Sequence, residues 1–255
     1  MTCETPISPG AGAPAWPRIR TLGVDGVLIS FGDRLEEPAN RAALALRDAI
    51  ERAGWDGIEE TTSSLVSTYL RFDPLHCDAA TVTARLESLL ATRDWSTAPL
   101  PRGRRLWRLP TVFGTDLAPQ LAEAATMAGL TPEAAIAQIA ATRLTVRTIG
   151  FAPGQPYLGD LPPAWDIPRQ TGLTPRVPEG AVTVAIRQIV LFAISAPTGW
   201  RHVGQTAFRL FRPEAPEPFA LRPGDEVIFD PVAPDKLERM RGDGPDGGAS
   251  FETLP

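Results

Sequence analysis

The chain is poor in the residues that build metal and disulfide sites. Its only cysteines are Cys3 and Cys77, and its only histidines are His76 and His202. Two cysteines so far apart form no disulfide framework, and the two isolated histidines lack the spacing of a zinc site. We therefore expect no protein-built metal site, and we expect the protein to reside in the reducing environment of the cytoplasm.

Long apolar runs, a basic excess and the common nucleotide-binding motifs are also missing. No apolar stretch reaches the roughly 18 residues that span a bilayer, and the N-terminus lacks the basic and apolar regions of a signal peptide. The net charge of −5 offers no basic footprint for nucleic acid. The sequence has no P-loop, no GxGxxG motif of a dinucleotide-binding site and no GxSxG nucleophile motif. We expect a protein that binds neither membranes nor nucleic acid.

Proline, in contrast, is abundant. The 27 prolines among 255 residues argue against an all-helical protein and favour loops and β-structure. Many lie in two adjacent stretches, residues 150–165 and 168–180, together with several glycines. Proline fixes φ and glycine allows positive φ or a close backbone approach. A long, apolar and rigid connection of this kind is interpreted as the wall of a binding site.

Three residues are the candidate catalytic groups, namely Arg169 and Arg176 of this region and His202, which follows Trp200-Arg201. Each arginine directly follows a proline, and a guanidinium held on a rigid backbone suits a carboxylate or a phosphate. His202 is a candidate acid or base. The alternatives are that the arginines bind loop carbonyls on the surface and that His202 is an edge-strand residue with its hydrogen bonds satisfied.

The candidate substrate-binding residues surround these groups in the sequence. They are Phe151, Pro153, Gly154, Gln155, Tyr157, Gln188 and Trp200. For the aromatic residues the alternative is an ordinary place in the core. Gln188 separates two apolar runs, so it lies at a hairpin turn or points into a pocket, and the sequence favours the turn.

The N-terminal half predicts a small α+β domain over residues 18–95, after a disordered tail over residues 1–17. Apolar alternation predicts strands over 18–23, 26–31 and 64–72, and helical spacing predicts helices over 38–52 and 79–90. Asp78 is the expected N-cap of the second helix. Strands followed by amphipathic helices indicate a sheet with helices on one side. Residues 94–103 are the expected linker.

The remaining chain predicts a second domain over residues 104–232. Expected strands at 104–112 and 144–151 flank helices at 116–128 and 132–141, the latter capped by Thr131. Apolar runs then predict strands over 181–186, 189–194, 207–211 and 227–229. Several short strands with Pro/Gly corners indicate a barrel or sandwich. The polar, Gly-rich residues 233–255 are expected to form a flexible tail.

Several motifs resemble one known family. They are GFAPGQPYL (150–158), TPRVPEGAV (174–182), APTGWRHVGQT (196–206) and LRPGDEVIFDPV (221–232). They look like the B-type subunit of ATP-dependent 5-oxoprolinase, a family also called allophanate hydrolase subunit 1, which includes inhibitors of the sporulation kinase. The resemblance covers residues 18–232, and the Pro/Gly segment is its most specific part.

The resemblance implies the fold, the partner and the activity. It implies an α+β protein in which a small N-terminal α+β sandwich domain is followed by a cyclophilin-like β-barrel with a pocket. It implies an enzyme that acts with a larger homologous C-type subunit, with an A-type subunit and with ATP, which is bound together with the partner. That enzyme opens the lactam of 5-oxoproline, a small-molecule substrate, by activating the amide carbonyl through phosphorylation and then hydrolysing it.

The chain departs from the family pattern at several positions. Ile139 stands where the family usually has His, Leu144 where it has Tyr, and Gln155 within the PGFPYL motif. The apolar replacements Ile139 and Leu144, with Val190 after the matching Gln, suggest a drier pocket for a more apolar ligand. Two alternatives follow, one a stand-alone biosynthetic enzyme such as a cyclase and the other a non-enzymatic inhibitor of a sensor histidine kinase.

Overall fold

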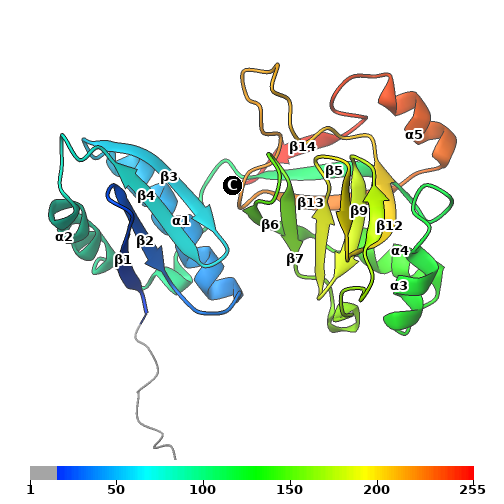
Figure 1. The fold of residues 1–255 in the computed structure, drawn as a ribbon, viewed down its shortest axis with the longest axis horizontal. Helices are drawn as coiled ribbons and strands as arrows, with labels where there is room; N and C mark the ends of the chain where they lie inside the picture. The colour runs from blue at the N-terminus through cyan, green and yellow to red at the C-terminus, as the bar shows by residue number, and fades with distance from the viewer. Residues whose placement is uncertain (1–15) are drawn as a thin grey trace, which may run out of the picture. The chain divides into compact units, whose positions relative to one another are not determined.

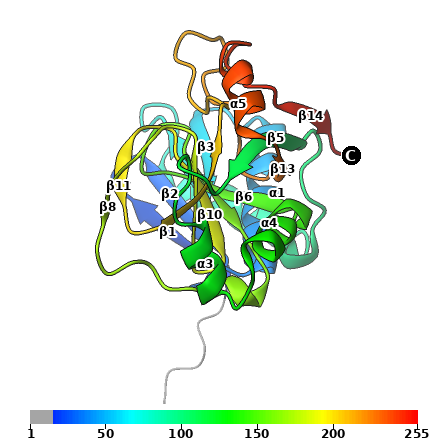
Figure 2. The same ribbon diagram turned by 90° about the vertical axis from the view of Figure 1, so that its right-hand side faces the viewer.

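The structure is a computed structural model that describes residues 16–255. The predicted tail over residues 1–17 lies, up to residue 15, outside the described part. The chain divides into two compact units. The N-terminal unit runs to Thr62 and continues over Val66–Ala98, and the barrel unit comprises Ser63–Leu65 and Pro99–Pro255. Figures 1 and 2 together label their helices and strands.

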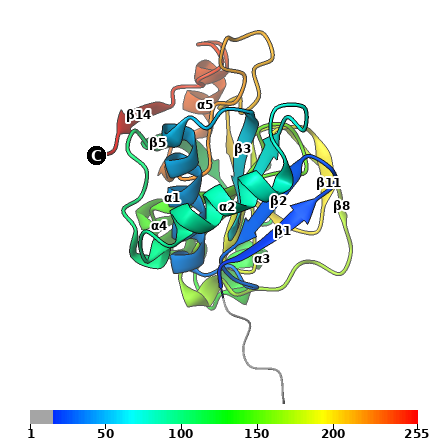
Figure 3. The same ribbon diagram turned by 90° about the vertical axis from the view of Figure 1, so that its left-hand side faces the viewer.

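The N-terminal unit is built on an antiparallel sheet with the order β1-β2-β4-β3. Its strands are β1 (Arg18–Leu22), β2 (Gly26–Ser30), β3 (Ile58–Ser64) and β4 (Ser67–Phe72). Helices α1 (Glu37–Ala53) and α2 (Ala79–Leu90) pack on one face, as Figures 1 and 3 show. Asp78 accepts a hydrogen bond from the Thr81 amide at 2.6 Å, so the predicted N-cap of α2 is confirmed.

Two expectations for this unit need correction. The single strand expected over 64–72 is a hairpin, because Leu65 takes a left-handed backbone (φ 53°) between β3 and β4. The sequence of β3, IEETTSS, has no apolar alternation and so gave no strand signal. The expected linker over 94–103 contains a 3₁₀ turn, Trp95–Thr97, and Trp95 is buried in the core of this unit.

The barrel unit closes a ring of strands in the order β12-β9-β10-β7-β6-β13-β5, with β5 returning to β12. The ring comprises β5 (Arg105–Phe113), β6 (Leu144–Ile149), β7 (Pro156–Gly159), β9 (Ala181–Ala185), β10 (Gln188–Leu191), β12 (Arg201–Thr206) and β13 (Glu226–Pro231). Gly204 lets β12 approach β5, because a Cβ there would lie 2.9 Å from Thr111 Cγ2. The predicted α+β class with a barrel domain is confirmed.

Helices α3 (Leu121–Met127) and α4 (Pro132–Ala141) lie against the barrel in Figure 2. The Ala134 amide donates to Thr131 Oγ1 at 3.2 Å, which confirms the predicted cap of α4. The Pro/Gly stretch holds β7, a 3₁₀ turn at Pro163–Trp165, and β8 (Thr174–Val177), which pairs with β11 (Ala196–Thr198). The expected loop is therefore a chain of short ordered elements.

Two expectations for the barrel unit also need correction, and one strand was missed. The helix expected over 116–128 begins after Gln120, because residues up to Pro119 form a turn. The strand expected over 207–211 is absent from the described barrel, where Phe211 forms an isolated bridge to Phe219. The strand in that part of the chain is β12, whose polar sequence RHVGQT is buried at every residue.

The flexible tail expected over 233–255 is ordered as α5 (Pro234–Arg241) and β14 (Ser250–Thr253). Leu237 anchors α5 with 1% of its surface exposed. β14 pairs antiparallel with the first half of β5, and the Phe251 ring lies 4.6 Å from the Trp107 ring. The polar composition predicted a flexible tail. The few apolar residues of this segment pack on partners such as Trp107, which lie far away in the sequence.

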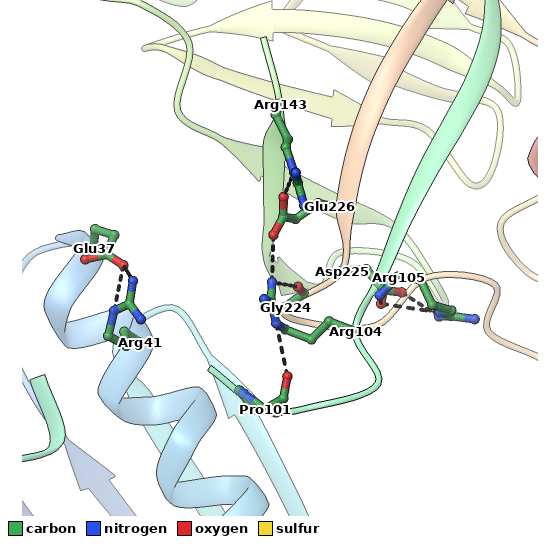
Figure 4. A network of polar contacts seen from close by, with 9 residues as sticks. All are labelled: Glu37, Arg41, Pro101, Arg104, Arg105, Arg143, Gly224, Asp225 and Glu226. Carbon is green, nitrogen blue, oxygen red and sulfur yellow. Dashed lines mark hydrogen bonds and ion pairs between the residues drawn. The ribbon is translucent and has the colours of Figure 1, made fainter. Parts of the chain in front are cut away.

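An ion-pair network ties β5 to the turn before β13 (Figure 4). Arg104 and Arg143 both bind the Glu226 carboxylate. Beside them, Asp225 accepts from the Arg105 guanidinium at 2.5 Å and from the backbone amides of Arg105 and Arg222, each at 3.0 Å. The Asp225 side chain is only 3% exposed, so this carboxylate is a buried charge with its partners in place.

Candidate functional site

A cavity of about 300 Å³, here called cavity A, opens between the Pro/Gly stretch, β10 and the turn before β12. Aromatic and aliphatic side chains form most of its wall, with a few polar groups among them. The lining residues are Phe151, Gln155, Tyr157, Arg169, Gln170, Leu173, Val190, Phe192, Pro197, Thr198, Gly199 and Trp200. A concave, mostly apolar site with few polar groups is the usual form of a small-molecule site.

Trp200 is the centre of the aromatic wall. Tyr157 meets it edge-on, with ring centroids 6.2 Å apart. The Arg169 guanidinium carbon lies 5.3 Å from the Trp200 ring centroid, within the range of a cation–π contact. Arg169 is exposed and Trp200 is buried, so the cation lies at the mouth of the cavity.

Gln170 fixes the segment that carries Arg169. Its backbone amide donates to the Gly199 carbonyl at 2.7 Å, and its Nε2 donates to the Trp200 carbonyl at 3.1 Å. Its Oε1 accepts from Gln120 Nε2 at 2.8 Å. Both walls of the cavity mouth are therefore joined by hydrogen bonds, which favours a preformed site.

The predicted substrate-binding residues divide between cavity and scaffold. Phe151, Gln155, Tyr157 and Trp200 line cavity A together. Pro153 and Gly154 do not line it. Pro153 is exposed, and Gly154 (φ 72°) packs on the backbone of Leu210. Gln188 lies opposite Ala185 at the start of β10, which agrees with a hairpin position rather than a pocket.

Two of the departures from the family pattern lie away from the cavity. Ile139 and Leu144 are fully buried in the hydrophobic core of the barrel unit. Only Val190 and Gln155, among the four positions considered, line cavity A. The expectation that Ile139 and Leu144 make the pocket drier is therefore wrong, because neither side chain reaches it.

Arg176 and His202 line a different cavity, cavity B, of about 410 Å³. Arg176 donates through Nε to Ser195 Oγ at 2.6 Å. Thr174 and Arg176 alternate with Pro175 on β8 and so share one side of the strand, which directs both toward cavity B. The three predicted catalytic residues are thus separated, with Arg169 in cavity A and the other two in cavity B.

Sequence reasoning missed several lining residues. In cavity A these include Gln170, Leu173 and Phe192, and in cavity B Gln120, Gln205 and Arg241. Gln170 directly follows Pro168-Arg169, so its position could have been included with Arg169. Arg241 lies in the expected tail and Gln205 in the unexpected strand β12, where the sequence carried no indication of either place.

His202 is 5% exposed, and its Nε2 has no hydrogen-bond partner among residues 16–255. Burial lowers the pKa of His202, because a charged imidazolium loses its hydration there, while the Gly204 backbone and the Gln205 side chain oppose the shift. The charged groups of cavity B are Asp116, Arg176 and Arg241. His202 is therefore a neutral side chain in the folded protein at neutral pH.

This shift predicts a pH dependence of stability. Below the ordinary histidine pKa of 6.5 the unfolded chain binds a proton at His202 that the folded chain does not. The free energy of unfolding is therefore expected to fall as the pH drops below about 6.5. Urea unfolding at pH 7.5 and pH 5.5 measures the change, and His202→Leu should reduce it. Equal pH dependence in the wild type and this variant would contradict the prediction.

Metal clusters and membrane-spanning helices are both absent from the described part of the chain. Within residues 16–255, no group of three or more His, Cys, Asp or Glu side chains could hold a metal ion. Over the same residues, no helix has the length and apolarity needed to cross a membrane.

Comparison with known proteins identifies the family. The family model described as carboxyltransferase domain, subdomain C and D, matches residues 17–221. The chain is 30% identical over 220 residues to the 5-oxoprolinase B subunit of Bacillus subtilis, covering 83% of this chain and 91% of that one. It is 36% identical over 146 residues to the protein of the same name from Escherichia coli O157:H7, covering 57% and 66%.

A solved structure agrees with this result. The crystal structure of TTHA0988 matches with a TM-score of 0.70 and 32% identity over 82% of this chain. The chain spans 40% of the length of TTHA0988, so that protein is considerably longer. As its Pro/Gly motifs predict, the chain belongs to the family of 5-oxoprolinase B subunits.

Proposed function

We propose that this chain is the B-type subunit of an ATP-dependent 5-oxoprolinase and that cavity A binds the lactam substrate. The observation that carries the proposal is the Arg169 guanidinium, 5.3 Å from the Trp200 ring centroid at the mouth of a small aromatic cavity. A ring would pack on the aromatic wall, and the guanidinium would bind a carboxylate. The names of the relatives in Bacillus subtilis and Escherichia coli support the assignment.

The composition of cavity A also supports a partner protein. None of its lining residues is a carboxylate, histidine, cysteine or lysine. Activating an amide carbonyl by phosphorylation and then hydrolysing it needs groups that handle protons and phosphate. We therefore assign binding and orientation of the lactam to this chain. ATP and the acid–base groups are assigned to a homologous C-type partner, since one arginine at cavity A is too little charge for a triphosphate.

Reconstitution tests this function. The full chain with C-type and A-type subunits is expected to release glutamate from 5-oxoproline only when ATP is present. Trp200→Ala should raise KM at least tenfold, because it removes both the aromatic wall and the support of Arg169. Arg222→Ala is the matched control, since its ion pair with Glu217 is exposed and outside both cavities. A complex that assembles without turnover would contradict the proposal.

A more apolar substrate for a stand-alone enzyme is the second candidate, and the cavity rim favours it. Phe151 and Leu173 are 71% and 68% exposed beside the opening of cavity A. Exposed apolar side chains around a pocket are typical of a binding surface. This candidate predicts that the isolated protein binds apolar ring compounds more tightly than 5-oxoproline, which a competition assay would decide.

A further inference from the structure

Gln155 presents a hydrogen-bond donor to cavity A. The side chain lines the cavity and is 1% exposed, so it forms part of the floor. Its Oε1 accepts from the Ala193 amide at 3.3 Å, which fixes the orientation of the carboxamide because an amide donor needs an acceptor. Among the described residues no hydrogen bond from Nε2 is found, and Nε2 is not one of the fully enclosed unpaired atoms, so this end of the amide is open to the cavity.

An unused donor on the floor of an aromatic cavity is available to a partner from outside the chain. Buried polar groups are almost always hydrogen-bonded, and a ligand acceptor at this depth would satisfy Nε2. Arg169 places a second requirement on the ligand, an anionic group, because its guanidinium is exposed at the mouth. The two groups therefore select two features of one ligand, an uncharged acceptor inside and an anionic group outside.

We propose that Gln155 and Arg169 determine the specificity of cavity A for small cyclic acids that carry a ring carbonyl. Gln155 Nε2 donates to the carbonyl oxygen at the floor, and Arg169 binds the carboxylate at the mouth. The Trp200 and Tyr157 rings enclose the ring between them. This inference rests on the proposed function for the location of the site and for its ligand, and it adds the residues that read the carbonyl and the carboxylate.

Three small ligands separate the two requirements. 5-Oxoproline has both groups, cyclopentanecarboxylate lacks the carbonyl, and 2-pyrrolidinone lacks the carboxylate. Calorimetric titration of the full chain is expected to show that 5-oxoproline binds tightest. Gln155→Met should weaken binding of 5-oxoproline about tenfold and leave cyclopentanecarboxylate unchanged. Arg169→Gln should weaken both acids and leave 2-pyrrolidinone unchanged.

A second variant keeps the test valid if Gln155→Met does not fold. Gln155→Glu retains an acceptor for the Ala193 amide and removes the donor. Its affinity for 5-oxoproline relative to cyclopentanecarboxylate should fall about tenfold, because any charge repulsion acts on both acids alike. The inference is overturned if neither variant changes this ratio, or if none of the three ligands binds the folded wild type.

The outcome is distinguishable from failure of the proposed function. A reconstituted complex that binds 5-oxoproline with these preferences and does not hydrolyse it contradicts the function and supports the specificity residues. A complex that turns over 5-oxoproline, with the ratio unchanged in the Gln155 variants, supports the function and overturns the role of Gln155.

Discussion

Replacing Asp225 with alanine is expected to lower the free energy of unfolding by about 3–5 kcal/mol. The Asp225 carboxylate is 3% exposed and receives hydrogen bonds from the Arg105 guanidinium and from two backbone amides. Removing it leaves the Arg105 guanidinium, whose side chain is only 13% exposed, and both backbone amides without this partner. Figure 4 shows how close these groups lie at the start of β5.

The same pair of strands supplies the matched control for this prediction. Asp230 pairs with Arg108 at 3.2 Å, but the two side chains are 43% and 52% exposed. Asp230→Ala is therefore expected to cost less than about 1 kcal/mol. Urea or guanidinium unfolding of both variants measures the difference. Similar losses for Asp225→Ala and Asp230→Ala would show that burial of the carboxylate has no special effect.

A comparable loss, about 3–5 kcal/mol, is expected for Trp165→Ala. Trp165 is completely buried and packs in the main core of the barrel unit. Its indole Nε1 donates to Gln138 Oε1 at 2.6 Å, and its carbonyl accepts from the Arg187 amide at 2.8 Å. The alanine variant loses the ring contacts and leaves a cavity beneath the Pro/Gly stretch.

Trp165→Phe separates the contribution of the apolar ring contacts from that of the hydrogen bond to Gln138. It retains most of the apolar contacts and removes the hydrogen bond to Gln138, so it should cost clearly less than the alanine variant. Chemical unfolding measures both. If Trp165→Ala unfolds at the same denaturant concentration as the wild type, the 3₁₀ turn at Pro163–Trp165 is not part of the stabilising core.

The elements that could be predicted from sequence are those set by local residues. Asp78 and Thr131 cap α2 and α4 as expected, because an N-cap bonds to an amide within three residues. Strand β12 was missed because its polar residues find partners far along the chain. Arg201, for instance, donates to Glu123 at 2.8 Å and to the Pro168 carbonyl at 2.7 Å.

The candidate site could likewise be predicted only in part. The Pro/Gly stretch placed Gln155, Tyr157 and Arg169 in one cavity with Trp200. Proximity in the sequence also suggested Arg176, but the alternation of β8 turns it toward cavity B with Thr174. The side of a strand on which a residue lies depends on pairing register, which composition and motifs do not determine.

Strand β5 has a consequence for the order in which the barrel can form during synthesis. One edge of β5 pairs with β12 and β14, and its other edge pairs with β13. Arg105 meets Asp225 across 120 residues of sequence. The strands that pair with β5, namely β12, β13 and β14, are synthesised much later. Until then the apolar residues of β5 lack these strand partners. Ring closure is a late event, and chaperones have their longest access to this strand.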